Sequence, residues 1–299
     1  MTNDDVAAPR WRGQPGRLEV WYATATDVRT GAGLWLHHEV VAPQSGEAYA
    51  HGWMATFPRE AGPEVVRYGP APAQPMTAAP DRFRGAAGGV TWDLGWAGDD
   101  PPLWTFPPYV WRRELLPSAH VVSAPGVRLS GTVRHGETET TVDARGAVAH
   151  IYGHGNAQRW AWLHAELDDS SVLEVIVAVA RRASMRWLPP LAFVRLRHGG
   201  RDWPGDPLAA APLFRARIGL PTWAVRGIVG TRRLSVSVTQ PRERCVRLDY
   251  TDPDGSPAVC TNCEVADATV RVESWRGRWR TSAEWSLTGT AHAEVGTRP

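Results

Sequence analysis

The residue types best suited to chemistry gather in one stretch, residues 149–167, which reads AHIYGHGNAQRWAWLHAEL. If residues 159–167 form a strand, successive side chains point to opposite faces. One face then carries Trp160, Trp162, His164 and Glu166. Two indoles beside an imidazole, whose intrinsic pKa is near neutral, and a carboxylate predict the wall of a pocket for a large apolar ligand.

The turn that precedes this strand carries further candidates. His154 lies between two glycines and is a candidate acid or base, while Asn156 suits a left-handed turn position and is also a candidate ligand contact. Tyr152 and His150 share a strand face if a strand extends that far. We expect one of the two to face the ligand and the other to cap the barrel.

Two earlier segments repeat this combination of aromatic, histidine and carboxylate residues. His37 and Glu39 share a face with Trp35, and His51 shares a face with Trp53. These side chains are candidates for the ligand site. Solvated pairs on an outer face are the alternative, because such residue types are mostly exposed.

Carboxylates on two further segments are candidates for a general acid. Asp93 follows Trp92 on a short expected strand, where it is either an acid or a plain turn former. His292 and Glu294 share a face near the end of the chain. A buried Glu294 would have a raised pKa and act as an acid, whereas an exposed pair would be structural.

The composition excludes several kinds of chemistry. The chain has no lysine, which excludes a Schiff-base lysine and a Walker-A lysine. Cys260 and Cys263 form a single C-x-x-C without a second pair, so we expect buried or incidental thiols and no metal. Ser130 and Ser171 lack a nucleophile-elbow setting. We expect no cofactor, and no arginine cluster along the sequence is dense enough to indicate nucleic-acid binding.

Length and composition indicate a globular protein. The 299 residues carry a net charge of +2, and the 16 tryptophans outnumber the 5 phenylalanines and 6 tyrosines together. The polar N-terminus is unlike a signal peptide, and no apolar run approaches the roughly 20 residues of a membrane span. We expect a cytoplasmic protein. The sequence leaves the oligomeric state open.

Period-two patterns separated by glycine and proline turns predict an all-β chain of many antiparallel strands. Residues 57–87 read as a long excursion with one short strand at 65–68, and the proline-interrupted run 103–115 as a lid or plug. Residues 172–180 read as a buried strand. We expect an N-terminal module over 1–188, with a disordered arm at 1–16, and a C-terminal module over 189–299.

The order of these motifs resembles a known group, the lipocalin-like superfamily of carotenoid 1,2-hydratases (hydroxyneurosporene synthases), tocopherol cyclases and fungal decalin-forming Diels–Alderases. The early segment VWYATATDVRTGAGLWLHHEVVAP and the closing segment 289–296 are similar to the family's. The residues that match its mid-chain turn and W-x-W strand are Tyr152, His154, Gly155, Trp160 and Trp162. Gly153 stands where the family commonly has an acid.

The resemblance implies two lipocalin-like (calycin-type) modules with the ligand cavity in or between them. It also implies a cofactor-independent cyclase, isomerase or hydratase, acting by pericyclic reaction or alkene protonation on a polyene, isoprenoid or polyketide. We expect His154, His164 and Glu294 to be catalytic, with the two indoles of the W-x-W strand as the wall. The alternatives are a non-catalytic carrier of a hydrophobic molecule and a structural partner protein.

Overall fold

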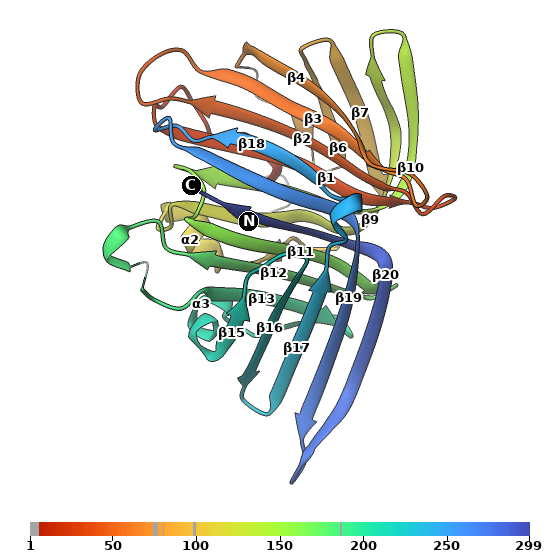
Figure 1. Cartoon of the computed structure of the whole chain (residues 1–299), viewed down its shortest axis with the longest axis vertical. Helices are drawn as coiled ribbons and strands as arrows, with labels where there is room; N and C mark the ends of the chain where they lie inside the picture. Colours follow the sequence, from red (N-terminus) through yellow and green to blue (C-terminus); the bar gives the residue numbers. More distant parts are fainter. Residues whose placement is uncertain (1–5, 74–76, 80, 98–99, 186) are drawn as a thin grey trace. The chain divides into compact units, whose positions relative to one another are not determined.

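A computed structural model of the chain describes residues 6–73, 77–79, 81–97, 100–185 and 187–299 (Figure 1). It confirms the prediction of an all-β fold with two antiparallel β modules. Two short α-helices and three 3₁₀ turns lie between the strands: α2 (Pro108–Arg113), α3 (Pro207–Ala210), Ala183–Met185, Ala211–Leu213 and Arg242–Arg244. No helix in the described ranges is long and apolar enough to cross a membrane.

The first sheet has ten strands in the order β4-β3-β2-β1-β10-β9-β7-β6-β5, with β8 paired to β9. Its strands are β1 (Arg17–Asp27), β2 (Gly33–Ala42), β3 (Tyr49–Phe57), β4 (Glu64–Pro72), β5 (Thr77–Ala79), β6 (Arg82–Ala87), β7 (Val90–Ala97), β8 (Leu103–Trp104), β9 (Ser118–His135) and β10 (Thr138–Gly153).

The second sheet repeats this order with every strand number raised by ten: β14-β13-β12-β11-β20-β19-β17-β16-β15, with β18 paired to β19. Its strands are β11 (Arg159–Asp168), β12 (Ser171–Val179), β13 (Leu191–His198), β14 (Arg201–Trp203), β15 (Phe214–Arg217), β16 (Thr222–Val229), β17 (Arg232–Thr239), β18 (Val246–Thr251), β19 (Pro257–Trp275) and β20 (Trp279–Thr297).

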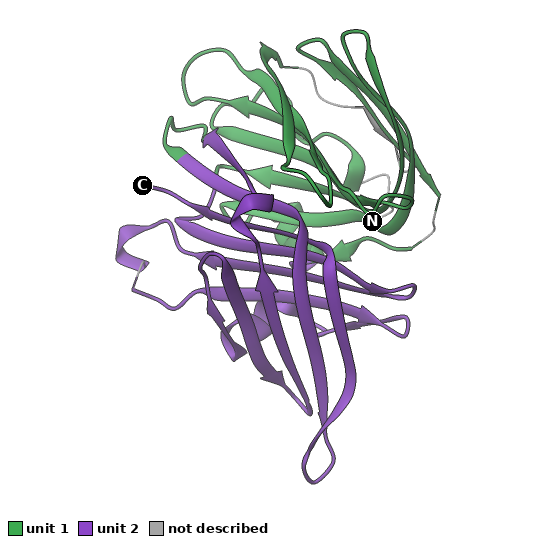
Figure 2. Ribbon diagram, turned by 45° about the vertical axis from the view of Figure 1, so that its right-hand side comes forward, with its two compact units in different colours: residues 1–104, 108–155, 251–257 green, residues 105–107, 156–250, 258–299 purple. Residues whose placement is uncertain are grey.

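The two compact units divide the chain at a different place from the one expected (Figure 2). Unit 1 comprises residues 1–104, 108–155 and 251–257, and unit 2 comprises 105–107, 156–250 and 258–299. The expected boundary at 188 and 189 lies between β12 and β13, which pair along their lengths from Val172 and Arg197 to Ala178 and Leu191. The proline-rich segment before β13 is therefore a connection within the second sheet.

The excursion expected over residues 57–87 is largely strand. It contains β4, β5 and β6. In β6 buried and exposed side chains alternate, with Phe83 buried between two exposed arginines. The aromatic run after β8 forms helix α2, which buries Val110 and Trp111. The run 103–115 thus contains a two-residue strand, β8, and a short helix, and whether it acts as a lid or a plug stays a prediction.

The arm expected to be disordered is packed against the first sheet from residue 6 onward; residues 1–5 lie outside the described ranges. Val6 is fully buried, and the carbonyl of Ala7 accepts a hydrogen bond from the indole of Trp21 at 3.2 Å. The amides of Arg10 and Trp11 donate to the two oxygens of Glu19 at 2.6 and 2.8 Å. The buried carboxylate of Glu19 thus anchors an N-terminal segment whose polar composition alone predicts disorder.

Candidate functional site

The expected strand of tryptophan and histidine is β11, and it lies near the middle of the second sheet. On β20, Glu294 lies opposite Trp162, and His292 lies opposite His164. On β12, Glu174 lies opposite His164. Residues directly opposite each other in a sheet share a face, so these five side chains form one continuous patch. The register of three strands thereby joins residues that are far apart in sequence.

Glu294 is the partly exposed acidic residue of this patch, and its carboxylate accepts two hydrogen bonds. The indole N–H of Trp160 donates to its Oε1 at 2.6 Å, and the thiol of Cys260 donates to its Oε2 at 3.2 Å. The residue is partly exposed. Desolvation of the carboxylate raises the pKa of Glu294, although both hydrogen bonds oppose the shift. A carboxyl held toward its protonated form can act as a general acid.

His164 is paired with Glu174 in the fully buried part of the patch. Its Nδ1 lies 2.8 Å from Oε2 of Glu174, and the indole of Trp162 donates to Oε1 of the same carboxylate at 2.5 Å. Burial lowers the pKa of His164 to about 4, so the ring is neutral at neutral pH. A neutral ring that gives its Nδ1–H to Glu174 leaves Nε2 as an acceptor, and this atom has no hydrogen-bond partner among the described residues.

A second histidine–glutamate pair continues the patch on β19 and β20. Nδ1 of His292 lies 2.8 Å from Oε2 of Glu264, whose other oxygen accepts from Asn262 at 3.0 Å. The rings of His164 and His292 are nearly parallel, with centroids 6.1 Å apart. Buried ionisable side chains are thus paired, as the cost of burying a lone charge requires.

The residues predicted on the early strands form a separate cluster in the first sheet. Nε2 of His37 and Nε2 of His51 lie 3.3 and 3.4 Å from the same oxygen of Glu39. His37 stacks on Trp53 with ring centroids 4.0 Å apart, and Trp35 meets Trp53 edge-on at 5.1 Å. The solvated outer-face alternative does not describe these residues, because His37 and Glu39 are buried.

The pKa of the carboxyl in this cluster is shifted in the direction opposite to that of Glu294. Burial alone favours the neutral acid, but the hydrogen bonds and charges of His37 and His51 lower the pKa of Glu39 to about 2. Burial lowers the pKa of His37, whereas Glu39 raises the pKa of His51 against the effect of its burial. The cluster therefore holds an ionised carboxylate paired with histidine, which is not a source of protons at neutral pH.

Three predicted residues around the mid-chain turn lie outside both clusters. The ring of His154 is exposed, and its Nδ1 lies 2.9 Å from Nη1 of Arg17. Tyr152 is buried beneath the guanidinium of Arg10, 4.9 Å from its ring centroid. Asn156 is half-buried, and its backbone carbonyl accepts from Arg298 at 3.4 Å.

Trp92 and Asp93 point to opposite faces of β7. Trp92 is buried against Tyr68, with ring centroids 5.6 Å apart. Asp93 is half-exposed, and hydrogen bonds from Arg82 and Arg84 lower its pKa to about 2. Asp93 is therefore a surface ion-pair partner, which does not fit the hypothesis that it supplies the acid absent at Gly153.

The sequence interpretation missed the partners of the predicted side chains. Glu174 interrupts an otherwise apolar strand, and Glu264 follows the C-x-x-C; a charge inside an apolar run was a usable signal for both. Cys260 was expected to be a buried or incidental thiol, but its contact with Glu294 has no sequence signal. The same is true of Glu19 and His150, which pair at 2.8 Å.

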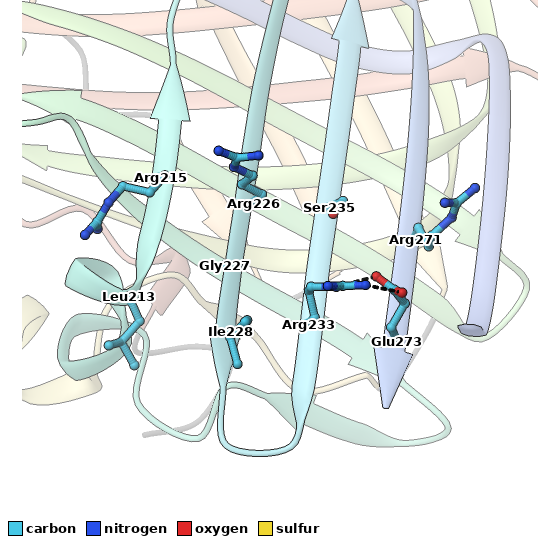
Figure 3. Close-up of a pocket in the computed structure, with 9 residues that line it drawn as sticks. All are labelled: Leu213, Arg215, Arg226, Gly227, Ile228, Arg233, Ser235, Arg271 and Glu273. Carbon is cyan, nitrogen blue, oxygen red and sulfur yellow. Dashed lines mark hydrogen bonds and ion pairs between the residues drawn. The ribbon is translucent and has the colours of Figure 1, made fainter. Parts of the chain in front are cut away.

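Among the described residues, neither metal-binding groups nor the pocket of the second sheet gives these side chains a further role. Within the described ranges, no group of three or more histidine, cysteine, aspartate and glutamate side chains is arranged to hold a metal ion. The pocket in Figure 3, of about 550 Å³, lies over β15, β16, β17 and β19, and none of the predicted site residues line it.

The comparisons with known proteins agree with the predicted resemblance. The chain shares the fold of a putative AttH from Nitrosomonas europaea, with a TM-score of 0.54 at 15% identity over 95% of this chain and 93% of the other. It shares the fold of CghA crystallised with Sch210972, with a TM-score of 0.57 at 11% identity over 94% and 88%.

Sequence relatives extend over the whole chain. Uncharacterized proteins of Mycobacterium tuberculosis from strains CDC 1551 and H37Rv are each 50% identical over 305 residues, covering 98% of this chain and 90% of their own length. The model of the family described as tocopherol cyclase-like matches residues 110–297, which include β11, β12, β19 and β20. The predicted superfamily is confirmed, and the chain belongs to the tocopherol cyclase-like family.

Proposed function

We propose that this protein is a cofactor-independent cyclase or hydratase that protonates an alkene of an apolar small molecule, with Glu294 as the acid. The observation that carries the proposal is the geometry of this residue: it is partly exposed, two donors fix the orientation of its carboxyl, and desolvation of the carboxyl raises its pKa. Membership of a tocopherol cyclase-like family supports an enzyme of this type.

The reaction requires one proton, which Glu294 donates to the substrate and later regains. The carboxyl proton of Glu294 adds to a trisubstituted double bond, which breaks the π bond, forms a C–H bond and leaves a tertiary carbocation beside a carboxylate. A hydroxyl of the same molecule attacks the cation, closes an ether ring and returns its proton to Glu294. Attack by water instead gives net hydration, and neither outcome requires an oxidant or a reductant.

The neighbouring side chains suit the charges that this reaction creates. Trp160 and Cys260 donate to the carboxylate that remains after proton transfer, and indole faces attract a nearby cation. His164 is fully buried and neutral, so we assign it to positioning Glu174 and Trp162 rather than to contact with substrate. His154 has no part in this proposal because its ring is exposed on a turn.

A prenylated hydroquinone in D₂O tests the reaction. Ring closure should incorporate one deuterium at the carbon beside the new C–O bond, seen by mass spectrometry. Glu294→Gln should lower the rate by at least about 100-fold, the usual contribution of a general acid. Glu284→Gln is the matched control, since it lies on the same strand, is exposed and pairs with Arg271 at 2.7 Å.

Full activity in Glu294→Gln would remove this residue from the chemistry. Small molecules that co-purify with the protein, identified by mass spectrometry, extend the test to other substrate classes. A compound retained tightly and recovered unchanged after prolonged incubation would favour the alternative of a hydrophobic-molecule carrier.

A further inference from the structure

Two hairpins of unit 2 end side by side. The β16–β17 and β19–β20 hairpins reach the same end of the second sheet (Figure 1). The backbone N–H of Trp275, at the tip of β19, donates to the carbonyl of Thr231 in the β16–β17 turn at 2.8 Å. Gly277 has a φ of 74°, which allows the tight β19–β20 turn. The two tips therefore form one surface, which we call the hairpin-tip surface.

Several bulky apolar side chains on this surface are exposed to solvent. Leu213, Ile228 and Trp275 are 52%, 45% and 49% exposed. Trp275 and Trp279 face each other across the turn with ring centroids 5.4 Å apart. Single exposed apolar residues are ordinary, but a group of them at a protruding end marks an interaction site.

Arginines surround these apolar side chains. Arg276 and Arg278 flank Gly277 in the turn WRGRW. Four more arginines line the pocket beneath the tips, together with Leu213 and Ile228 (Figure 3); they are Arg215, Arg226, Arg233 and Arg271. They are spread along the sequence, which is why no basic cluster was visible there.

Positive charge on this surface exceeds the acidic partners available to it. Glu273, the one acidic residue of the pocket lining, is paired with Arg233 through both oxygens, and Arg271 is paired with Glu284 at 2.7 Å. These two pairs leave the charges of Arg215 and Arg226 unbalanced within the pocket. Arg215 lies directly opposite Arg226 across the β15–β16 pair. Like charges at opposed positions destabilise a sheet unless an anion lies between them. The pocket thus has the charge and the size for a phosphate headgroup.

We propose that the hairpin-tip surface docks the protein on a bilayer that contains anionic phospholipid. Tryptophan favours the headgroup region of a membrane, and arginine forms paired hydrogen bonds with phosphate. Surfaces that combine a basic face with aromatic and aliphatic side chains bind anionic bilayers peripherally. The aliphatic side chains of Ile228 and Leu213 favour lipid over nucleic acid, because bases stack on aromatic rings. Docking here does not depend on Glu294.

Co-sedimentation of the full chain with vesicles tests this proposal. We expect binding to vesicles of phosphatidylcholine with about 30% phosphatidylglycerol, much weaker binding to pure phosphatidylcholine, and loss of binding as NaCl rises from about 0.1 to about 0.5 M. The double variant Arg276→Gln/Arg278→Gln should bind about 25-fold more weakly, or about fivefold for each charge removed. Trp275→Ala should lower binding about tenfold.

Trp187→Ala is the matched control, because Trp187 is 79% exposed and lies on the connection between β12 and β13. Unchanged circular dichroism and thermal unfolding establish that the turn variants are folded. Equal binding to both kinds of vesicle, binding to neither, or an equal loss in Trp187→Ala would overturn the proposal. So would binding of oligo-dT that competes with vesicles and is lost in Trp275→Ala.

Discussion

The two sheets share one strand order but carry different side chains on their central strands. In the first sheet, the row across β2, β1 and β10 that contains the β10 histidine reads His38, Trp21 and His150. In the second sheet, the row across β12, β11 and β20 that contains the β20 histidine reads Glu174, His164 and His292. Aromatic packing at the centre of one row is replaced by a buried titratable group in the other.

The partners of these rows also differ. In the first sheet the N-terminal arm supplies hydrogen-bond partners. The carbonyl of Val6 lies 2.7 Å from Nδ1 of His150, and the amides of Arg10 and Trp11 donate to Glu19, which also binds His150. In the second sheet the indoles and imidazoles of the same sheet bind the carboxylates. The same strand order therefore occurs with two different features: in the first sheet the N-terminal arm binds His150 and Glu19, and in the second sheet Glu294 is a candidate acid.

The largest expected effect comes from removing the carboxylate that binds the central histidine of each sheet, Glu19 at His150 and Glu174 at His164. Glu174→Ala and Glu19→Ala should each lower the free energy of unfolding by about 3–5 kcal/mol, because buried donors lose their acceptor. Chemical denaturation measures both. Combination with deletion of residues 1–11 separates them: the effect of Glu19→Ala should shrink markedly in the truncated chain, whereas that of Glu174→Ala should stay the same. Equal coupling of both variants to the arm would break the comparison.

The opposite pKa shifts of two carboxylates predict opposite pH dependence. The pKa of Glu39 is lowered to about 2 in the folded state, so its stabilisation is present above about pH 4.5 and is lost as the pH falls toward 2. That loss amounts to about 3 kcal/mol and should be absent in Glu39→Gln. The folded pKa of Glu294 is raised, so its contribution is present below about pH 4.5 and is lost as the pH rises through the folded value.

Denaturant unfolding over a series of pH values measures both carboxylates. The profile of Glu294→Gln should lose less stability than the unmodified chain as the pH rises, because glutamine resembles the neutral acid. Parallel profiles for Glu39→Gln, Glu294→Gln and the unmodified chain would show that the two carboxylates have the same protonation behaviour.

The smallest expected effect concerns glycines that make room for indoles. A methyl group at Gly296 would overlap the ring of Trp160, and one at Gly85 would overlap the ring of Trp92. Gly296→Ala and Gly85→Ala should each cost about 1–3 kcal/mol of stability through overpacking. The first should also lower turnover of the prenylated hydroquinone, since it displaces the indole that binds Glu294; the second should leave turnover nearly unchanged. Thermal unfolding and the deuterium assay provide the two readouts.

The local elements were predictable because they depend on short-range patterns. Alternation predicted a strand over residues 159–167, and the structure has it over 159–168 with the expected side chains on one face. The same reasoning placed Glu294 on a closing strand. The arm was misread because its polar composition gives no sign of a buried acceptor such as Glu19.

The partners were not predictable because they depend on register between distant strands. Which residue of β19 meets Glu294 follows from a ladder that contains bulges between Cys263 and Ala266 and between Ala266 and Ala268. A single sequence carries no record of such offsets. The repeat of strand order in the two sheets was equally hidden, because it is a property of pairing rather than of composition.

The bond between Trp160 and Glu294 joins residues that are 134 positions apart. At ordinary translation rates of about 5–20 residues per second, β11 leaves the ribosome about 7 to 27 s before the strand that carries the acid. During that interval its two indoles have no β20 beside them. During synthesis the exposed indoles of β11 can therefore bind chaperones, or promote aggregation, until β20 emerges.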